Sequence, residues 1–306
     1  MLESKMSKYE KDAIKQIHEW KNPKLSIFDR AMELINYPFE KALELTSEIP
    51  GADNLKEVVY KSVQGVLEIL NDFAQKSVRT EAIFKEFREG NLDVYEHKDI
   101  YNIDLQKVDH IVGYLGAKYK SLALAEGSAT GLAGIVGIPI DISSLLTLNL
   151  RAIGEYATYY GFDINTQHER FFAMNILGYA SSSKDSTKYV VLSQLEKIAV
   201  DVARNKSWST LQQSIIVRVI KNISESIGIR LTKAKLAQVI PVLGALVGGG
   251  FNAYYTNKVC EAAYYLYRER FLATKYEKPE VIEINTNWEN NFDIEYLSGD
   301  ERKELK

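Results

Sequence analysis

Three charged residues could perform chemistry in this sequence, because they interrupt a long apolar segment. Asp141, Arg151 and Glu155 lie within residues 137–163, where most neighbours are aliphatic or small. Ionised side chains need partners in such surroundings, since burial without them is costly. Arg151 and Glu155 are four positions apart and can form an ion pair on a helix. That pair could fix the packing of helices, or it could anchor a ligand or a metal in a polar pocket.

Asp141 and Glu155 cannot hold one ion together on a straight helix. They are 14 positions apart in the sequence, which corresponds to roughly 21 Å at the rise of an α-helix. Pro139 predicts a simpler role for Asp141, because proline favours the first helical position and a carboxylate two residues later meets the N-terminal dipole. We therefore expect Asp141 at the start of this helix and the Arg151–Glu155 pair farther along it.

The end of this segment and the start of the next predicted helix could together form a metal site. Glu155 and Asp163 precede the next predicted helix, and His168 and Glu169 begin it. Carboxylate and imidazole groups are the ligands of many zinc and iron sites. The alternative is a capping box, in which Thr166 and Glu169 cap the helix and His168 is simply exposed. The repeated Glu-x-x-His pairs of helical di-metal sites do not occur in the sequence.

Other catalytic signatures are missing from the sequence. It contains neither the Gly-x-Ser-x-Gly elbow of hydrolases nor a Gly-Lys-Ser/Thr phosphate loop. The single cysteine, Cys260, lies in an apolar helical pattern that is typical of a small core residue. The sequence therefore identifies neither a catalytic nucleophile nor a cofactor.

Composition limits the function classes further. The net charge is −3 and no strongly basic face is apparent, so we do not expect nucleic-acid binding. One cysteine cannot form an internal disulfide, which fits a reducing compartment. Residues 1–14 are charged throughout, unlike the apolar core of a signal peptide. We therefore expect a cytoplasmic location, with peripheral association at the inner membrane as an open option.

Helices are the elements that must position these residues. Apolar residues recur at helical spacing, strand-type alternation is scarce, and only 6 prolines occur. Residues 90–103 are predicted to be a loop, since Gly90 and Asn91 open a stretch without periodicity. Amphipathic patterns predict helices over residues 5–20, 25–48, 54–77, 80–88, 104–125, 186–204 and 210–227.

Two glycine-rich apolar stretches, residues 127–150 and 236–255, share an Ile-Pro step. Small residues three or four positions apart let helix backbones approach closely. A proline interrupts each stretch, and a membrane span needs roughly 20 apolar residues, so we expect buried hairpins rather than spans. The predicted fold is an all-α, multi-helix bundle with two packed Gly-rich helical hairpins, residues 104–180 and 230–275.

The predicted organisation has three parts. N-terminal amphipathic helices occupy residues 1–50, a helical domain occupies residues 51–278, and an acidic, flexible tail occupies residues 279–306. One face of the first helix is basic and could lie on an anionic membrane, although interleaved acidic residues weaken its field. The basic residues of this face are Lys5, Lys8, Lys11 and Lys15, and the interleaved acidic residues are Glu10, Asp12 and Glu19.

The segment GIPIDISSLLTLNLRAIGEYATYYGFD, residues 137–163, resembles the signature of the EcsC family. The likeness rests on a Pro-x-Asp step, an Arg-x-Ile followed by an acidic residue, and a closing Tyr-Gly-aromatic-Asp. Residues 240–259 are similar to the family's second glycine-rich block, and the resemblance covers approximately residues 55–275. The family takes its name from bacterial operons that encode an ABC transporter, and no enzymatic activity is generally assigned to it.

The resemblance implies an accessory or regulatory protein that acts through a protein partner or at the anionic inner face of the membrane. Two other classes stay open on the residues themselves. One is a metal-dependent enzyme that uses the polar residues named above. The other is a protein that binds a lipid or another small ligand, with a polar pocket near Arg151 and Glu155.

Overall fold

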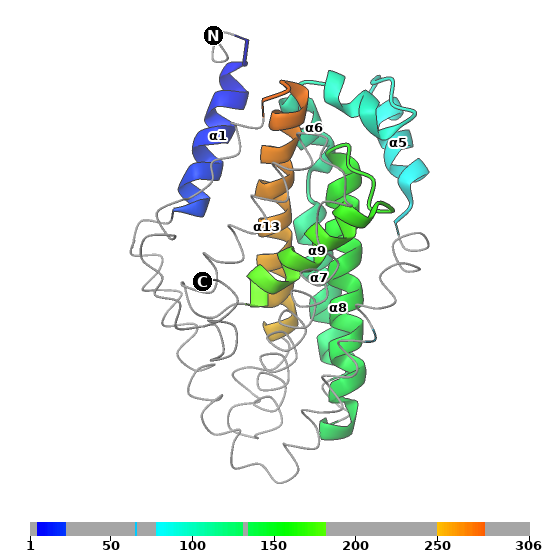
Figure 1. Cartoon of the computed structure of the whole chain (residues 1–306). Coiled ribbons are helices and arrows are strands. Elements are labelled where there is room, and N and C mark those ends of the chain that lie inside the picture. The colour runs from blue at the N-terminus through cyan, green and yellow to red at the C-terminus, as the bar shows by residue number, and fades with distance from the viewer. Residues whose placement is uncertain (1–4, 23–64, 66–77, 131–133, 182–249, 279–306) are drawn as a thin grey trace, which may run out of the picture.

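The structure is a computed structural model, and it describes residues 5–22, 65, 78–130, 134–181 and 250–278 (Figure 1). Within these ranges every regular element is a helix, so the predicted all-α class is confirmed. The elements are α1 (Lys8–Lys21), α5 (Thr80–Glu89), the 3-10 helix η2 (His97–Asn102), α6 (Leu105–Val112), α7 (Leu115–Thr130), α8 (Gly134–Tyr159), α9 (Gln167–Ser181) and α13 (Gly250–Lys275).

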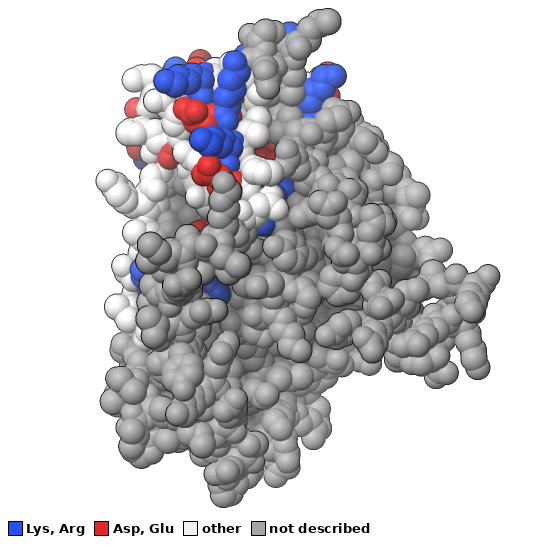
Figure 2. All heavy atoms as spheres, turned by 90° about the vertical axis from the view of Figure 1, so that its left-hand side faces the viewer, with Lys and Arg blue, Asp and Glu red and all other residues white. Residues whose placement is uncertain are grey.

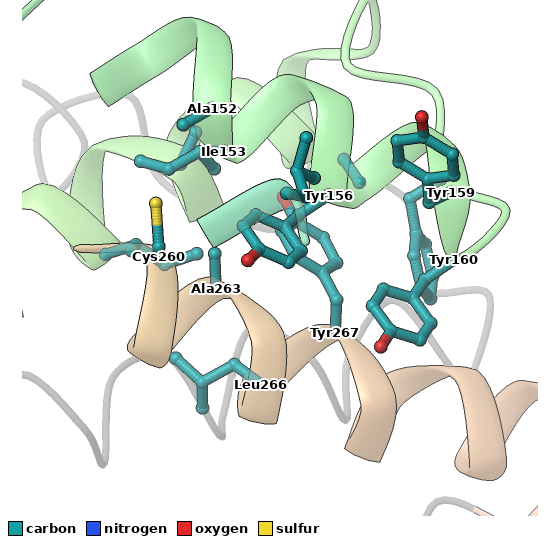
Figure 3. Close-up of a cluster of buried hydrophobic side chains, with 14 of the residues drawn as sticks. Ala152, Ile153, Tyr156, Tyr159, Tyr160, Cys260, Ala263, Leu266 and Tyr267 are labelled. Atoms are coloured by element: carbon teal, nitrogen blue, oxygen red, sulfur yellow. The ribbon is translucent and has the colours of Figure 1, made fainter. Parts of the chain in front are cut away.

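Helix α13 lies at the centre of the described part of the molecule, with α1, α7, α8, α9 and η2 packed around it (Figure 1). This helix is rich in aromatic and small residues, and most of its residues are buried. Figure 3 shows Ile153 and Tyr156 of α8 facing Cys260 and Ala263 of α13. The fully buried Ala263 leaves room for the two backbones to approach closely.

The helix α8 begins at Gly134, five residues before Pro139. The expectation that Pro139 opens the helix and that Asp141 meets its N-terminal dipole is therefore wrong. Proline inside a helix costs one backbone hydrogen bond, and here the helix continues through it. Asp141 is consequently a buried carboxylate within the helix rather than at its start.

A glycine in the left-handed conformation forms the turn that ends α8. Gly161 has a φ of +87°, and the backbone N–H groups of Gly161 and Phe162 donate back to Thr158 and Ala157. This is the Schellman arrangement, which favours glycine because a left-handed conformation strains other residues. The hydroxyl of Tyr101 donates to the carbonyl oxygen of Gly161 at 2.6 Å and holds the turn in place.

Other predictions about organisation have mixed outcomes. The segment 90–103 is not entirely a loop, because residues 97–102 form η2. Much of the second predicted glycine-rich hairpin, the boundary at residue 50 and the tail 279–306 lie outside the described residues. None of the helices in the described ranges is long and apolar enough to cross a membrane.

Candidate functional site

Glu155 forms the ion pair that the sequence spacing predicts, together with a second cation from another helix. Its Oε1 lies 3.3 Å from Arg151 Nε, and its Oε2 lies 2.9 Å from Lys118 Nζ on α7. The Glu155 side chain is 7% exposed, whereas those of Lys118 and Arg151 are 51% and 40% exposed. A buried carboxylate is thus neutralised by two cations at the surface, which leaves one positive charge in excess.

The cysteine beside this carboxylate is a core residue, as predicted. Cys260 is buried, and burial together with the nearby Glu155 charge raises the pKa of its thiol to about 12. A thiol with such a pKa is protonated at neutral pH, and the thiolate is the nucleophilic form. The Cys260 thiol is therefore buried and protonated at neutral pH, which does not favour a role as a nucleophile.

Asp141 occupies a separate position near the other end of α8. Asn252 of α13 donates from its Nδ2 to Asp141 Oδ1 at 3.2 Å, and both residues are buried. Burial and the Asp141 charge raise the pKa of Glu126 on α7. A Cβ atom on Gly127 would lie 2.8 Å from Asn252 Nδ2, so glycine gives this amide its space. The site joins α7, α8 and α13 and does not include Glu155.

The structure does not gather Glu155, Asp163, His168 and Glu169 into one set of metal ligands. Asp163 Oδ1 accepts hydrogen bonds from the backbone N–H and side-chain amide of Asn165, and Glu169 is paired with Arg270 of α13. Among the described residues, no three His, Cys, Asp or Glu side chains are placed to hold a metal ion. The predicted cap is present in part, because the Thr166 hydroxyl accepts from the Glu169 N–H at 3.3 Å.

Three consecutive charged residues on α13 are buried, and the sequence pattern did not predict this. Arg268, Glu269 and Arg270 are each less than 5% exposed. Successive helical residues point about 100° apart, so the three side chains reach three different neighbours. Their partners are Asp109 on α6, Lys21 on α1 and Glu169 on α9. The sequence feature that could have indicated these buried ion pairs is a run of three charges within a helix rich in aromatic residues.

Aromatic rings complete the surroundings of Arg270. Its guanidinium carbon lies 4.0 Å from the ring centroid of Phe162 and 4.2 Å from that of Phe172. Both terminal nitrogens donate to the two carboxylate oxygens of Glu169. Such a bidentate, stacked arrangement suits arginine and not lysine. It holds α9 against α13 and leaves Glu169 no role as an open metal ligand.

Asp109 ties α1, α6, α8 and α13 together. Its Oδ2 accepts from Tyr9 at 2.8 Å and lies 2.8 Å from Arg268 Nη2, and its Oδ1 accepts from Tyr160 at 2.6 Å. Figure 3 shows Tyr160 near the end of α8, with its hydroxyl directed away from the α8 backbone. With three donors, this carboxylate is fully compensated inside the protein.

The predicted basic face of the first helix is exposed to solvent, as its periodicity predicts. Lys5, Lys8, Lys11 and Lys15 are all exposed. Glu10 does not belong to that face, because it is buried and accepts hydrogen bonds from Tyr276 and Lys275. Figure 2 views the molecule from the side that carries α1, where basic and acidic side chains are interspersed.

Helices α7 and α8 both carry exposed apolar and basic side chains. The described part of the chain exposes five large hydrophobic residues, and all but Tyr95 lie on these helices or immediately before them. These four are Tyr114, Leu122, Leu124 and Ile140, at 90%, 43%, 49% and 68% exposure. Lys118, Lys120 and Arg151 share the same two helices. We call these seven residues the hairpin face.

Comparison with known proteins places the chain among bacterial relatives. It is 23% identical to the "Uncharacterized protein YdbA" of Bacillus subtilis over 273 residues, which cover 87% of this chain and 94% of the relative. It is 28% identical to "Protein EcsC" of the same organism over 183 residues, or 60% and 71% of the two chains. No solved structure matches. The model of the EcsC protein family matches residues 11–272, and the chain therefore belongs to the EcsC family.

Proposed function

We propose that this protein is an accessory protein that binds the anionic inner face of the bacterial membrane through the hairpin face. One observation carries the proposal: the exposed large apolar side chains of the described residues are concentrated on α7 and α8. Large apolar side chains that are exposed on a folded domain can mark a contact site for a protein or a membrane. Tyrosine and leucine at such a surface can enter the boundary between lipid headgroups and acyl chains.

The charges of the hairpin face favour anionic lipid as its partner. Lys118, Lys120 and Arg151 are at least partly exposed, whereas the carboxylates of Asp141 and Glu155 on α8 are buried. Each basic residue near an anionic membrane surface contributes about 1 kcal/mol to binding. Long basic side chains can also extend toward the headgroups while their stems cover apolar surface. The face therefore offers both the apolar and the electrostatic component of peripheral binding.

Catalysis has less support from the described residues. Glu155 is compensated by two cations, Asp109 by three donors, and the pKa of the Cys260 thiol is about 12. Carboxylates and thiols that serve in catalysis usually have free access to a substrate and a pKa near the working pH. A role in binding uses the observed surface without requiring any of these groups to react.

Vesicle flotation tests the proposal. The full chain should float with vesicles that contain phosphatidylglycerol at low salt, and should stay at the bottom with phosphatidylcholine vesicles. Lys120→Gln should weaken binding about fivefold, because it removes one cation worth about 1 kcal/mol, and the pair Leu122→Gln with Ile140→Gln should weaken it further.

Tyr95→Gln is the matched control, because it removes an equally exposed large side chain, 69% exposed, that lies outside the hairpin face. It should float like the unmodified protein. Failure of the unmodified protein to float, or equal losses from the control and the hairpin variants, contradicts membrane binding by this face and favours a protein partner instead.

A further inference from the structure

A groove with a volume of about 800 Å³ lies between α1, α6, α13 and the turn after α5. Its volume falls within the range of sites that take small molecules. It uses none of the residues of the hairpin face.

The acidic residue of the groove does not repel an anion. Asp109 is compensated by Arg268, which lies 2.8 Å away, and by hydrogen bonds from Tyr9 and Tyr160. Burial and the hydrogen bond to Asp109 raise the pKa of Tyr9 to about 12, so Tyr9 remains a protonated donor at neutral pH. The Asp109 carboxylate thus fixes Tyr9 in the wall of the groove, and Arg268 balances its charge.

The rim of the groove offers hydrogen-bond donors that no other described residue engages. Lys107 and His110 lie three positions apart on α6, and Gln106 and Asn91 lie beside them on the rim. All four residues are exposed, and within the described ranges none of their side chains has a hydrogen bond or an ion pair. Residues three apart on a helix project to the same side. Lysine, with histidine and two amides as neighbours, suits a carboxylate or phosphate group.

The walls of the groove are apolar and fixed. Tyr264 is held by Arg268, whose guanidinium carbon lies 4.6 Å from the ring centroid, and Tyr9 is held through Asp109. Leu92 and Ile111 add aliphatic surface. Sites for small molecules typically combine such walls with a few polar groups that orient the ligand.

We propose that this groove binds a small organic anion, with the anionic group held by Lys107 and His110 and an aromatic or aliphatic body packed against Tyr9 and Tyr264. This site is independent of membrane binding by the hairpin face. The shared chemistry is a carboxylate or phosphate on an apolar body, which a soluble metabolite or a lipid headgroup could supply.

Calorimetric titration of the full chain with phenyl phosphate and phenylacetate tests the site. At least one of them should bind about tenfold more tightly than inorganic phosphate or phenol, because only the combined ligand uses both walls and rim. Lys107→Gln should weaken binding about tenfold, since it removes a charge-assisted contact. Lys98→Gln is the control, because Lys98 is exposed on η2, is paired with Glu96 and lies outside the groove.

Two results would overturn the site. One is that neither anion binds at millimolar concentration, and the other is that Lys107→Gln binds as the unmodified protein does. Flotation with phosphatidic acid vesicles separates the two sources of ligand when Lys107→Gln is added to the Leu122→Gln/Ile140→Gln variant, whose hairpin face binds membranes weakly. A loss of flotation identifies a lipid headgroup in the groove, whereas unchanged flotation with weakened phenyl phosphate binding identifies a soluble anion.

Discussion

Lys21 Nζ lies 2.7 Å from Glu269 Oε1, although the two residues are 248 positions apart in the sequence. Their side chains are only 4% and 5% exposed, so the pair joins α1 to the C-terminal part of α13 within the protein interior. Removal of one partner from a buried pair leaves an uncompensated charge, which costs about 3–5 kcal/mol.

We therefore expect Lys21→Met and Glu269→Met each to lower the free energy of unfolding by several kcal/mol in urea titrations. The double variant should recover much of the loss, because two apolar side chains of similar volume can replace a buried ion pair. Single losses that simply add in the double variant would show that the pair is not coupled as the structure has it.

Gly161 is expected to be intolerant of a side chain. Its φ is +87°, and an added Cβ would lie 2.8 Å from a ring carbon of Tyr101 and 2.9 Å from the carbonyl oxygen of His97. Gly161→Ala should destabilise the protein by about 2 kcal/mol or more, since the left-handed backbone alone costs about 1–2 kcal/mol. Thermal unfolding measures the effect, with Gly250→Ala as the control because no atom lies within 4 Å of its added Cβ. Equal melting temperatures for the two variants would contradict this turn geometry.

Glu10 should make stability sensitive to acid. Burial raises the pKa of Glu10, but hydrogen bonds from Tyr276, the Ser7 N–H and Lys275 outweigh it and hold the pKa below its usual 4.5. A carboxyl with a lowered folded-state pKa stabilises the fold above its unfolded pKa, and this contribution is lost as the pH falls through the folded pKa.

Urea titrations at a series of pH values between 7 and 3 can isolate this contribution. The difference in unfolding free energy between the unmodified protein and Glu10→Gln should be largest near neutral pH and should shrink on acidification below about 4.5. A difference that stays constant over this range would exclude Glu10 as the titrating group. Asp12→Asn is the matched control, because Asp12 is exposed on the same helix.

Cys260 should resist thiol reagents in the native protein. Its side chain is buried, and burial and Glu155 raise its pKa to about 12. Reaction with a chromogenic disulfide reagent at pH 8 should be very slow without denaturant and rapid in urea, because only an accessible thiolate reacts. Rapid modification of the native protein would contradict the packing of α13 against α8.

Local chain geometry is what the sequence determined by itself. The helical class and the Arg151–Glu155 pair both depend on residues within about one turn of each other, where helix geometry fixes the spacing. The same reasoning separated Asp141 from Glu155 along one helix. It placed the start of α8 wrongly, because the preference of proline for a first helical position is a statistical tendency that α8 does not follow.

Only the tertiary structure decided which distant residues meet. Lys118 pairs with Glu155, Asn252 donates a hydrogen bond to Asp141, and Arg270 pairs with Glu169, a predicted metal ligand. These contacts join residues 37, 111 and 101 positions apart. Periodicity shows which face of a helix is buried, but not which helix covers that face. The pairing of buried charges follows from how the helices dock, because each buried charge requires a partner from the element packed against it.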